Sequence, residues 1–434
     1  MKRRTTLGRI SQLAIAALAL APQADAQSLS SRIDTLFGPH GIVLDVDPGL
    51  GFEHTAHFTS TALSTLGLLV SQLAPGASDF PALSTVPGFS YRYNPELEEF
   101  ERASNTLGPI FTERARTIGK GRVDVGVAYS YVKFDELNGT DLDSMTLILD
   151  HPDSVTFGEE FATVQFERFD LQSHVVSFFA TYGITDRWDV NLLLPLVATS
   201  LDVRANVKLA NVVTGFPCEG TPPGCHFFDT TTFADEMEYS AKGSETGVGD
   251  LLLRTKYLLF TNDQFNFASG LILRVPTGNQ ENFQGLGDTT LNIFFAAASE
   301  ISRFHLHATL GFDINLNEAD RSRVRYAAGA TVQLWDSFAF TADIIGHSNL
   351  TSQEISARVP VFGNDAFDLD PESPTIDSYT TVSESLRTDI VDIALGFEVN
   401  VFGSVVGFAN VFVPLNSDGL RAKAVPTVGV EYSF

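Results

Sequence analysis

The sequence lacks any apolar run that could cross a membrane as a helix, once its first residues are set aside. Such a helix needs about 20 mostly apolar residues in a row. The 434 residues contain no stretch of that kind, although 44% of them are hydrophobic. A helical membrane protein is therefore excluded, and the apolar residues must be distributed along the chain in another pattern.

Basic residues are also scarce, because 28 Lys and Arg stand against 53 Asp and Glu, which gives a net charge of −25. Contacts with nucleic-acid phosphates need clustered Lys and Arg, so nucleic acid is excluded as a partner. Intrinsic disorder needs a low apolar content, which this chain does not have. The protein is thus acidic and folded, and it is rich in apolar residues.

Cysteine occurs twice, at Cys218 and Cys225, on either side of a short stretch that contains Pro222-Pro223-Gly224. In an exported protein, two cysteines this close usually form a local disulfide. Two cysteines without a histidine cluster at ligand spacing do not make a zinc site. We therefore expect a disulfide between Cys218 and Cys225, no metal site and no cofactor.

Residues 1–26 have the pattern of a secretory signal peptide. Basic residues begin the segment, Leu13 to Ala21 form a short apolar core, and Ala24-Asp25-Ala26 is a small-residue cleavage site. The core is too short for a membrane anchor. We expect cleavage before Gln27 and export from the cytoplasm.

From about residue 121 onwards, apolar residues alternate with polar or small ones. Phe304, Leu306 and Leu310 fall on one face of such a segment, whereas His305 and His307 fall on the other. Side chains on a strand point alternately to opposite faces, so this segment has one apolar face and one polar face. Its length suits a tilted strand that crosses a membrane.

The same alternation predicts twelve strands. Tight turns and longer spacers alternate between them, which is the layout of an outer-membrane barrel. A spanning sheet must close on itself because lipid offers no hydrogen bonds to a free edge. The fold class is therefore all-β, a transmembrane antiparallel up-and-down β-barrel over residues 119–434 in the outer membrane of a Gram-negative bacterium. The predicted strands are 121–134, 172–184, 188–209, 248–260, 265–277, 287–299, 304–316, 323–334, 338–349, 387–400, 404–416 and 421–434.

Residues 27–118 do not share this alternation, and they are expected to form a plug or a periplasmic segment. Residues 60–74 have apolar residues at helical spacing, and Pro75-Gly76 is expected to end that helix. Apolar stretches at 89–93 and 100–103 flank a turn sequence and predict a short hairpin. If this hairpin joined the wall, the barrel would have fourteen strands.

On each predicted strand, the side chains that alternate with the outward apolar ones point into the lumen. Positive and negative side chains are both present there, which favours paired charges in a partly filled interior over a wide ion-selective pore. A few apolar side chains share this face and suit the passage of apolar molecules. The lumen candidates are Asp250, Arg254, Lys256, Arg274, Asp288, His305, His307, Asp313, Arg323, Arg325, Asp343, Glu398, Lys423, Glu431, Ile272, Phe294, Phe408 and Phe412.

The chain ends in a strand pattern with a terminal Phe434, which resembles the last strand of outer-membrane proteins and implies recognition by the barrel assembly machinery. Most of the acidic excess lies in the longer spacers. Such acids usually form a solvated face, and here that face would lie beside outer-membrane lipid and lipopolysaccharide.

Stretches such as Leu107 to Ala115, Thr117 to Arg122 and Tyr182 to Asp189 resemble those of a family of bacterial outer-membrane barrels that is named for the meta-cleavage pathway of phenol degradation. The resemblance covers about residues 85–434, and its most specific part is the turn from Tyr182 to Asp189. It implies the passage of small hydrophobic molecules, in a plan similar to that of channels for fatty acids and aromatic hydrocarbons. The matching stretches are Leu107 to Ala115, Thr117 to Arg122, Tyr182 to Asp189, Gly247 to Leu251 and Gly285 to Asp288.

The leading hypothesis is passive uptake of small hydrophobic or aromatic compounds through the barrel. A structural or adhesive barrel with acidic surface loops is the first alternative. An outer-membrane lipid hydrolase is the second, because His347 and Ser348 are adjacent. Adjacent residues on a strand point to opposite faces, whereas a nucleophile and its base must lie within hydrogen-bonding reach, so this geometry counts against an enzyme.

Overall fold

The structure is a computed structural model. Neither the predicted signal peptide nor the pair Cys218 and Cys225 lies among the residues that it describes, so both stay predictions. The described residues are 27–38, 41–44, 58–79, 84, 91–94, 99–102, 110–150, 160–213, 216–217, 227–229, 231–262, 264–362 and 376–434.

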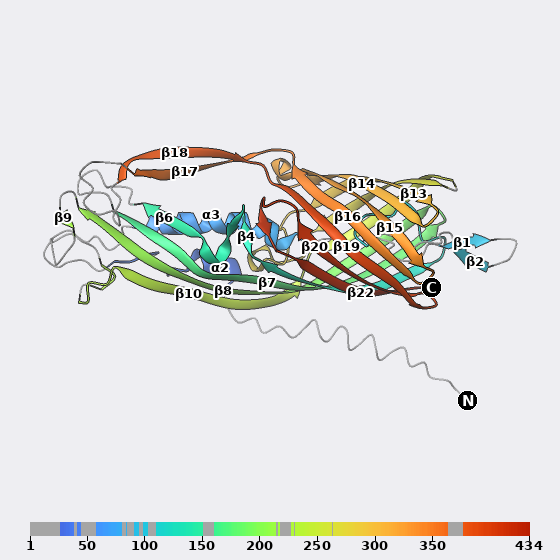
Figure 1. The fold of residues 1–434 in the computed structure, drawn as a ribbon, viewed down its shortest axis with the longest axis horizontal. Coiled ribbons are helices and arrows are strands. Elements are labelled where there is room, and N and C mark those ends of the chain that lie inside the picture. The colour runs from blue at the N-terminus through green and yellow to red at the C-terminus, as the bar shows by residue number, and fades with distance from the viewer. Residues whose placement is uncertain are drawn as a thin grey trace, which may run out of the picture.

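Twelve antiparallel strands form a closed barrel, in which the last strand pairs with the first (Figure 1). This confirms the predicted fold class and strand number. The hairpin of β1 (Tyr91–Asn94) and β2 (Glu99–Arg102) forms a separate two-stranded sheet, so it does not add two strands to the wall. The wall consists of β3 (Val123–Phe134), β7 (Glu160–Thr185), β8 (Trp188–Val213), β11 (Leu251–Thr261), β12 (Phe265–Val275), β13 (Thr290–Ile301), β14 (Phe304–Asn315), β15 (Arg323–Trp335), β16 (Phe338–Asn349), β19 (Asp389–Phe402), β20 (Val405–Pro414) and β22 (Val425–Ser433).

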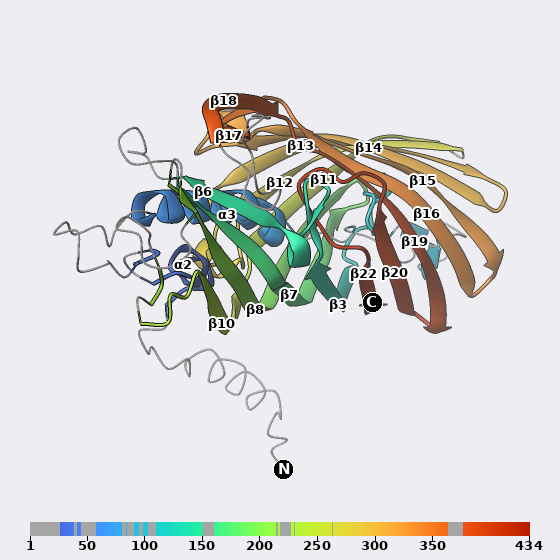
Figure 2. The same ribbon diagram turned by 60° about the vertical axis from the view of Figure 1, so that its left-hand side comes forward.

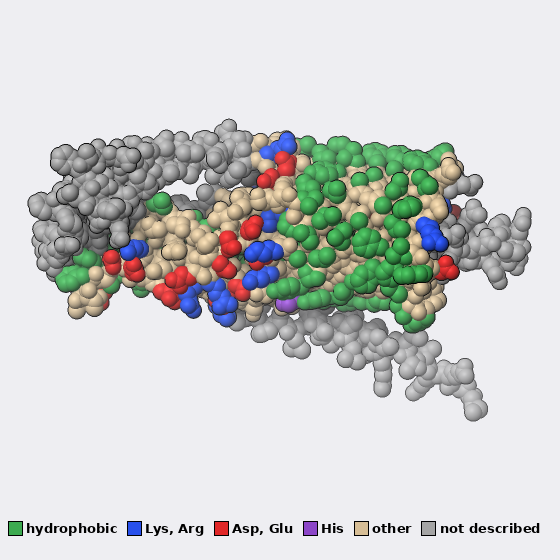
Figure 3. Space-filling model, in the orientation of Figure 1, with side chains coloured by type: hydrophobic (Ala, Val, Ile, Leu, Met, Phe, Trp, Pro, Cys, Tyr) green, Lys and Arg blue, Asp and Glu red, His purple; other side chains and the backbone are tan. Residues whose placement is uncertain are grey.

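Side-chain exposure alternates along the wall strands as the sequence predicts. On β14, Phe304 and Leu306 are 51% and 44% exposed, whereas His305 is 0% exposed. The outward apolar side chains form a continuous band over the right-hand half of the molecule in Figure 3, and charged side chains lie at its borders. A band of this kind, bordered by charge, is the outer surface of a transmembrane barrel.

β7 and β8 continue far beyond the apolar band, where β6 (Thr146–Asp150) and β10 (Glu236–Val248) extend the sheet. Both β10 and β11 pair with β8, on either side of Gly249 and Asp250, so together they follow the path of one bent strand. The predicted strands leave 135–171 and 210–247 as spacers, and this is corrected for β6, for the first part of β7 and for β10, which are strands. The outer face of this extended sheet is polar because it does not meet lipid, and cross-strand ion pairs such as Arg204–Glu238 (3.4 Å) and Lys208–Glu236 (3.1 Å) replace apolar contacts.

Two helices, α2 (Leu29–Asp34) and α3 (Thr59–Ser78), pack against the extended sheet (Figure 2). Their apolar side chains form a common core with it, to which α2 contributes Leu29 and α3 contributes Leu73. Burial of such side chains is the main force that holds helix and sheet together. Within the described part of the chain, no helix is long and apolar enough to cross a membrane.

Pro75 lies inside α3, so the expectation that Pro75-Gly76 ends this helix is wrong. A proline in a helix removes one backbone hydrogen bond. The last turn nevertheless packs well, because Ala74 and Ala77 are buried. A Cβ atom at Gly76 would lie 2.6 Å from Cβ of Leu420, so glycine there allows the helix to approach the wall.

The remaining elements connect the wall strands on the long-loop side, and all are short except β17 and β18, which pair as a separate antiparallel hairpin. They are β4 (Glu136–Leu137), β5 (Thr140–Asp141), η3 (Leu142–Ser144), β9 (Phe216–Pro217), η4 (Gln280–Asn282), η5 (Ala319–Arg321), β17 (Gln353–Phe362), β18 (Ile376–Leu386) and β21 (Leu420–Arg421).

Candidate functional site

Residues 110–118 run through the half of the lumen nearest the tight turns. Arg254 Nη1 lies 3.4 Å from Glu113 Oε1, and Lys256 Nζ donates a 2.8 Å hydrogen bond to the carbonyl oxygen of Arg114. On another part of the wall, Thr309 Oγ1 donates to the Glu113 carbonyl at 3.4 Å. Residues 110–118, called the lumen segment below, are thus held by at least two strands. They occupy the half of the lumen nearest the tight turns, which we call the lower lumen.

Two of the stretches that carry the family resemblance meet at the rim of the barrel where the tight turns lie. Asp189 Oδ2 accepts the backbone N–H of Ile118 at 3.1 Å, and Thr117 Oγ1 donates to the Asp186 carbonyl at 2.7 Å. The backbone N–H of Gly121 donates to the Gly183 carbonyl at 2.7 Å. The stretch from Thr117 to Arg122 and the turn from Tyr182 to Asp189 therefore form one anchor, through which the lumen segment enters the wall.

Gly183 is required at this anchor because a side chain has no room there. A Cβ atom at Gly183 would lie 1.8 Å from the carbonyl oxygen of Gly119. Gly183→Ala is expected to lower the free energy of unfolding by about 3 kcal/mol, the upper end of the usual cost of overpacking. Urea unfolding of the purified barrel in micelles, followed by circular dichroism, measures this.

Gly407 on β20 is the matched control, since a Cβ atom there would meet its nearest neighbour, Cγ2 of Val401, at 3.7 Å, an ordinary contact. Gly407→Ala is expected to be neutral or to stabilise by up to about 1 kcal/mol. Equal losses in the two variants would contradict the anchor.

A second pair of motifs meets where β10 turns into β11. Asp250 accepts backbone N–H groups from Gly278 (3.1 Å) and Leu286 (2.8 Å). A Cβ atom at Gly285 would lie 2.4 Å from Asp250 Oδ1, so the loop can approach Asp250 this closely only because residue 285 is glycine. The stretches Gly247 to Leu251 and Gly285 to Asp288 thus hold a loop against the barrel mouth.

Above the lumen segment lies a cavity of about 840 Å³. The end of α3 lines it on the long-loop side, and Phe111 to Glu113 line it on the side of the lumen segment. One part of its surface is apolar: the rings of Phe111 and Phe412 meet edge to face at 4.4 Å, with Ile272 and Ile390 near them on the lining. A pocket of this size and mixed lining is typical of a small-molecule site.

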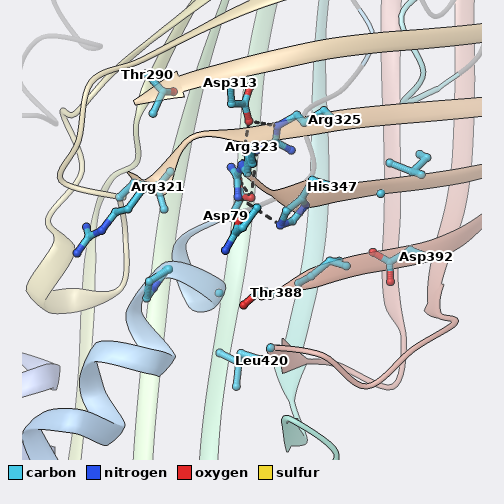
Figure 4. A pocket seen from close by; sticks show the side chains of 18 of the residues that line it. Asp79, Thr290, Asp313, Arg321, Arg323, Arg325, His347, Thr388, Asp392 and Leu420 are labelled. Atoms are coloured by element: carbon cyan, nitrogen blue, oxygen red, sulfur yellow. Dashed lines mark hydrogen bonds and ion pairs between the residues drawn. The ribbon is translucent and has the colours of Figure 1, made fainter. Parts of the chain in front are cut away.

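The cavity lining also carries a cluster of charges around Asp79, the residue that follows α3 (Figure 4). Its carboxylate lies 2.8 Å from Arg323 Nη2, 3.1 Å from Arg325 Nη2 and 3.1 Å from Arg274 Nη2. Asp313 forms ion pairs with both Arg323 and Arg325.

Burial raises the pKa of the Asp79 carboxyl, but the charges of Arg323, Arg325 and Arg274 outweigh burial and hold that pKa well below its usual range. Asp79 is therefore ionised at neutral pH. The attraction between Asp79 and the arginines is present above the ordinary pKa of an aspartate and is lost only in strong acid.

The structure places most predicted lumen residues in two groups. The first lines the cavity, and the second is buried beside the lumen segment, where His307 Nε2 lies 2.5 Å from Asp343 Oδ1. Asp250 is buried at the barrel mouth, whereas Lys423 is exposed and lies between β21 and β22. The cavity group is Arg254, Arg274, Asp288, Asp313, Arg323, Arg325, Ile272, Phe294 and Phe412. The lower group is Lys256, His305, His307, Asp343, Glu398, Glu431 and Phe408.

Strand parity misses three side chains of the site, Asp79, Glu113 and Arg114, because none of them lies on a wall strand. For Glu113 and Arg114 a signal exists, since both fall in the stretch Leu107 to Ala115 that carries the family resemblance. For Asp79 the sequence has no comparable signal.

His347 and Ser348 do not form a catalytic pair here. His347 Nε2 faces the lumen, 3.3 Å from Arg323 Nη1, whereas Ser348 Oγ lies 3.5 Å from the hydroxyl of Tyr326. The two side chains thus have separate partners, as the alternation along β16 predicts.

The fold and the lumen together define a class of protein, a closed twelve-stranded membrane barrel. Its own N-terminal segment fills the half of the lumen nearest the tight turns, and the other half contains the cavity. The family described as "Putative MetA-pathway of phenol degradation" matches residues 153–344, which confirms the predicted resemblance over that part of the chain. No curated protein matches the chain.

Three solved structures are similar to this chain at low sequence identity. An outer-membrane channel from Pseudomonas putida F1 is 13% identical, with a TM-score of 0.43 over 74% of this chain and 98% of that one. A toluene transporter from Ralstonia pickettii is 9% identical, with a TM-score of 0.34 over 73% of this chain and 90% of that one. A FadL homologue from Pseudomonas aeruginosa is 9% identical, with a TM-score of 0.30 over 72% and 89%.

Proposed function

We propose that this protein is an outer-membrane channel for the passive uptake of small hydrophobic or aromatic compounds. The observation that carries the proposal is the cavity of about 840 Å³ inside a closed barrel, with aromatic and aliphatic side chains on its lining. The apolar part of the lining can bind an apolar solute, and its polar groups can orient that solute. The match to a family named for phenol degradation supports an aromatic solute.

The same proposal includes export by a cleaved signal peptide and insertion into a membrane that contains lipopolysaccharide. The C-terminal strand offers the assembly machinery an accessible end, because Phe434 is 51% exposed and stacks on Tyr432 at 5.4 Å. Its backbone N–H donates to the Val123 carbonyl at 2.9 Å, which joins the chain end to the first strand of the barrel.

Filling the cavity tests the proposal. Ala327 lines the cavity, so Ala327→Trp places an indole inside it. We expect uptake of radiolabelled 4-phenylbutanol to fall at least about fivefold, because the indole takes space that the solute needs. The measurement uses whole cells of a host that lacks its own channels for such compounds.

Ala328, the next residue on β15, is exposed on the outside of the wall, so Ala328→Trp is the matched control. Its uptake should equal that of the wild type. The proposal is contradicted if cells with the wild-type protein take up no more of the alcohol than cells without it, or if Ala327→Trp has no effect.

A further inference from the structure

Asp79 is a carboxylate that the N-terminal segment inserts into a site built by the wall. Three arginines from β12 and β15 contact it, and its side chain is 7% exposed. Guanidinium groups in this number and geometry are a strong site for a carboxylate. Asp79 itself follows α3 and belongs to no wall strand, so the anion and its site are separate parts of the molecule.

The charges that line the cavity balance only while Asp79 is in place. Seven arginines and seven carboxylates line it, and Asp79 is one of those carboxylates. If Asp79 moved away, the lining would carry one excess positive charge, next to Arg323 and Arg325. The side chain of Arg325 is 35% exposed, so it is the member of the cluster most accessible from the cavity.

The arginine cluster and the apolar lining face the same cavity, so a single molecule can reach both. Its anionic group would meet the arginines, and its apolar body would lie beside Phe111 and Phe412. We propose that Arg274, Arg323 and Arg325 form the binding site for the carboxylate of small apolar carboxylic acids, and that Asp79 occupies this site until such an acid displaces it. This rests on the proposed function, whose solute class it narrows.

Displacement exchanges one carboxylate for another at the same three arginines. The ligand therefore competes with Asp79, and by linkage each weakens the binding of the other. Asp79 has the advantage of being tethered, which gives it a high effective concentration at the site. An acid that binds must also gain contacts with the apolar lining, so formate or acetate cannot replace Asp79, whereas an acid with a phenyl or alkyl body can.

The test compares 4-phenylbutanoate with 4-phenylbutanol, which share an apolar body and differ in the carboxylate. Binding of each radiolabelled compound to the purified full-length protein in micelles is measured by equilibrium dialysis at pH 7. Asp79→Asn should bind the acid about tenfold more tightly than the wild type, because the internal competitor has lost its charge. Arg325→Gln should bind the acid at least about tenfold more weakly. The affinity for the acid relative to that for the alcohol should therefore rise in Asp79→Asn and fall in Arg325→Gln.

Asp202→Asn is the control, since this carboxylate pairs with Lys242 at 3.1 Å on the extended sheet and not in the cavity. It should leave binding of the acid unchanged. Asp79→Ala is a second variant without the charge and should show the same gain as Asp79→Asn. The inference is overturned if neither Asp79 variant binds the acid more tightly, or if Asp202→Asn gives an equal gain.

Cell uptake of the alcohol separates this inference from the proposed function. If the alcohol enters through the wild-type protein, and Asp79→Asn leaves binding of the acid unchanged, only the carboxylate site is wrong. If the alcohol does not enter, the proposed function is wrong. A tenfold gain for the acid in both Asp79 variants, with uptake of the alcohol intact, supports both.

Discussion

Arg114→Ala is expected to lower the free energy of unfolding by about 3–5 kcal/mol, the cost of leaving buried charges without their partner. Arg114 is 0% exposed in the lower lumen. The carboxylate of Glu300 and the buried carboxyl groups of Glu398 and Glu431 attract its guanidinium. Removing this positive charge leaves those acids close to one another in a site with little water.

Urea unfolding in micelles measures this, with Arg116→Ala as the matched control two residues away. Arg116 pairs with Glu300 at 3.0 Å, and both side chains are partly exposed, 17% and 18%. Its loss should cost about 1 kcal/mol or less, because solvent can take over from the partner. If the two variants unfold at the same urea concentration, Arg114 does not hold the lower lumen together.

The wall of the barrel is predictable from the sequence because lipid imposes a strict pattern on it. Every second side chain must be apolar, so β14 (Phe304–Asn315) and β16 (Phe338–Asn349) can be located to within a residue. The number of strands follows in the same way. The hairpin at 91–102 stays outside the wall because its strands are too short to span.

The extended sheet is not predictable by the same rule, because it leaves the membrane. On the outer face of β10, Glu236 and Glu238 take places that apolar residues hold in the wall strands, and the resulting pattern resembles that of a charged loop. The strands are stable there because α2 and α3 cover the other face, and that packing depends on tertiary structure.

The candidate site residues also divide into those that the sequence predicts and those that it does not. Parity identifies Arg274, Arg323 and Arg325 as inward-facing, since their strands obey the lipid pattern. It cannot identify Asp79 as their partner, because that contact joins residues about 200 or more positions apart, and no periodicity records it. The lumen wall is thus predictable, whereas the way in which the N-terminal segment fills it depends on the fold.

Removing residues 27–118, with the signal peptide kept, is expected to turn the protein into an open pore. In the full-length protein, Ile110, Arg114 and Ile118 are buried in the lumen and block the direct path for ions. A barrel of twelve strands is wider than the eight-stranded barrels that side chains fill alone, so its lumen should admit water once this segment is gone. We expect single-channel conductance in planar bilayers to rise at least about tenfold.

A second variant, in which residues 110–114 are replaced by Gly and Ser at unchanged length, keeps α3 and Asp79 and should also conduct more than the wild type. If the wild-type protein already conducts as well as both variants, the N-terminal segment does not close the lumen. Uptake of an apolar solute needs a binding path and not a wide aqueous pore. The closed lumen and the cavity above it therefore predict that the wild type takes up the solute and yet has a low conductance.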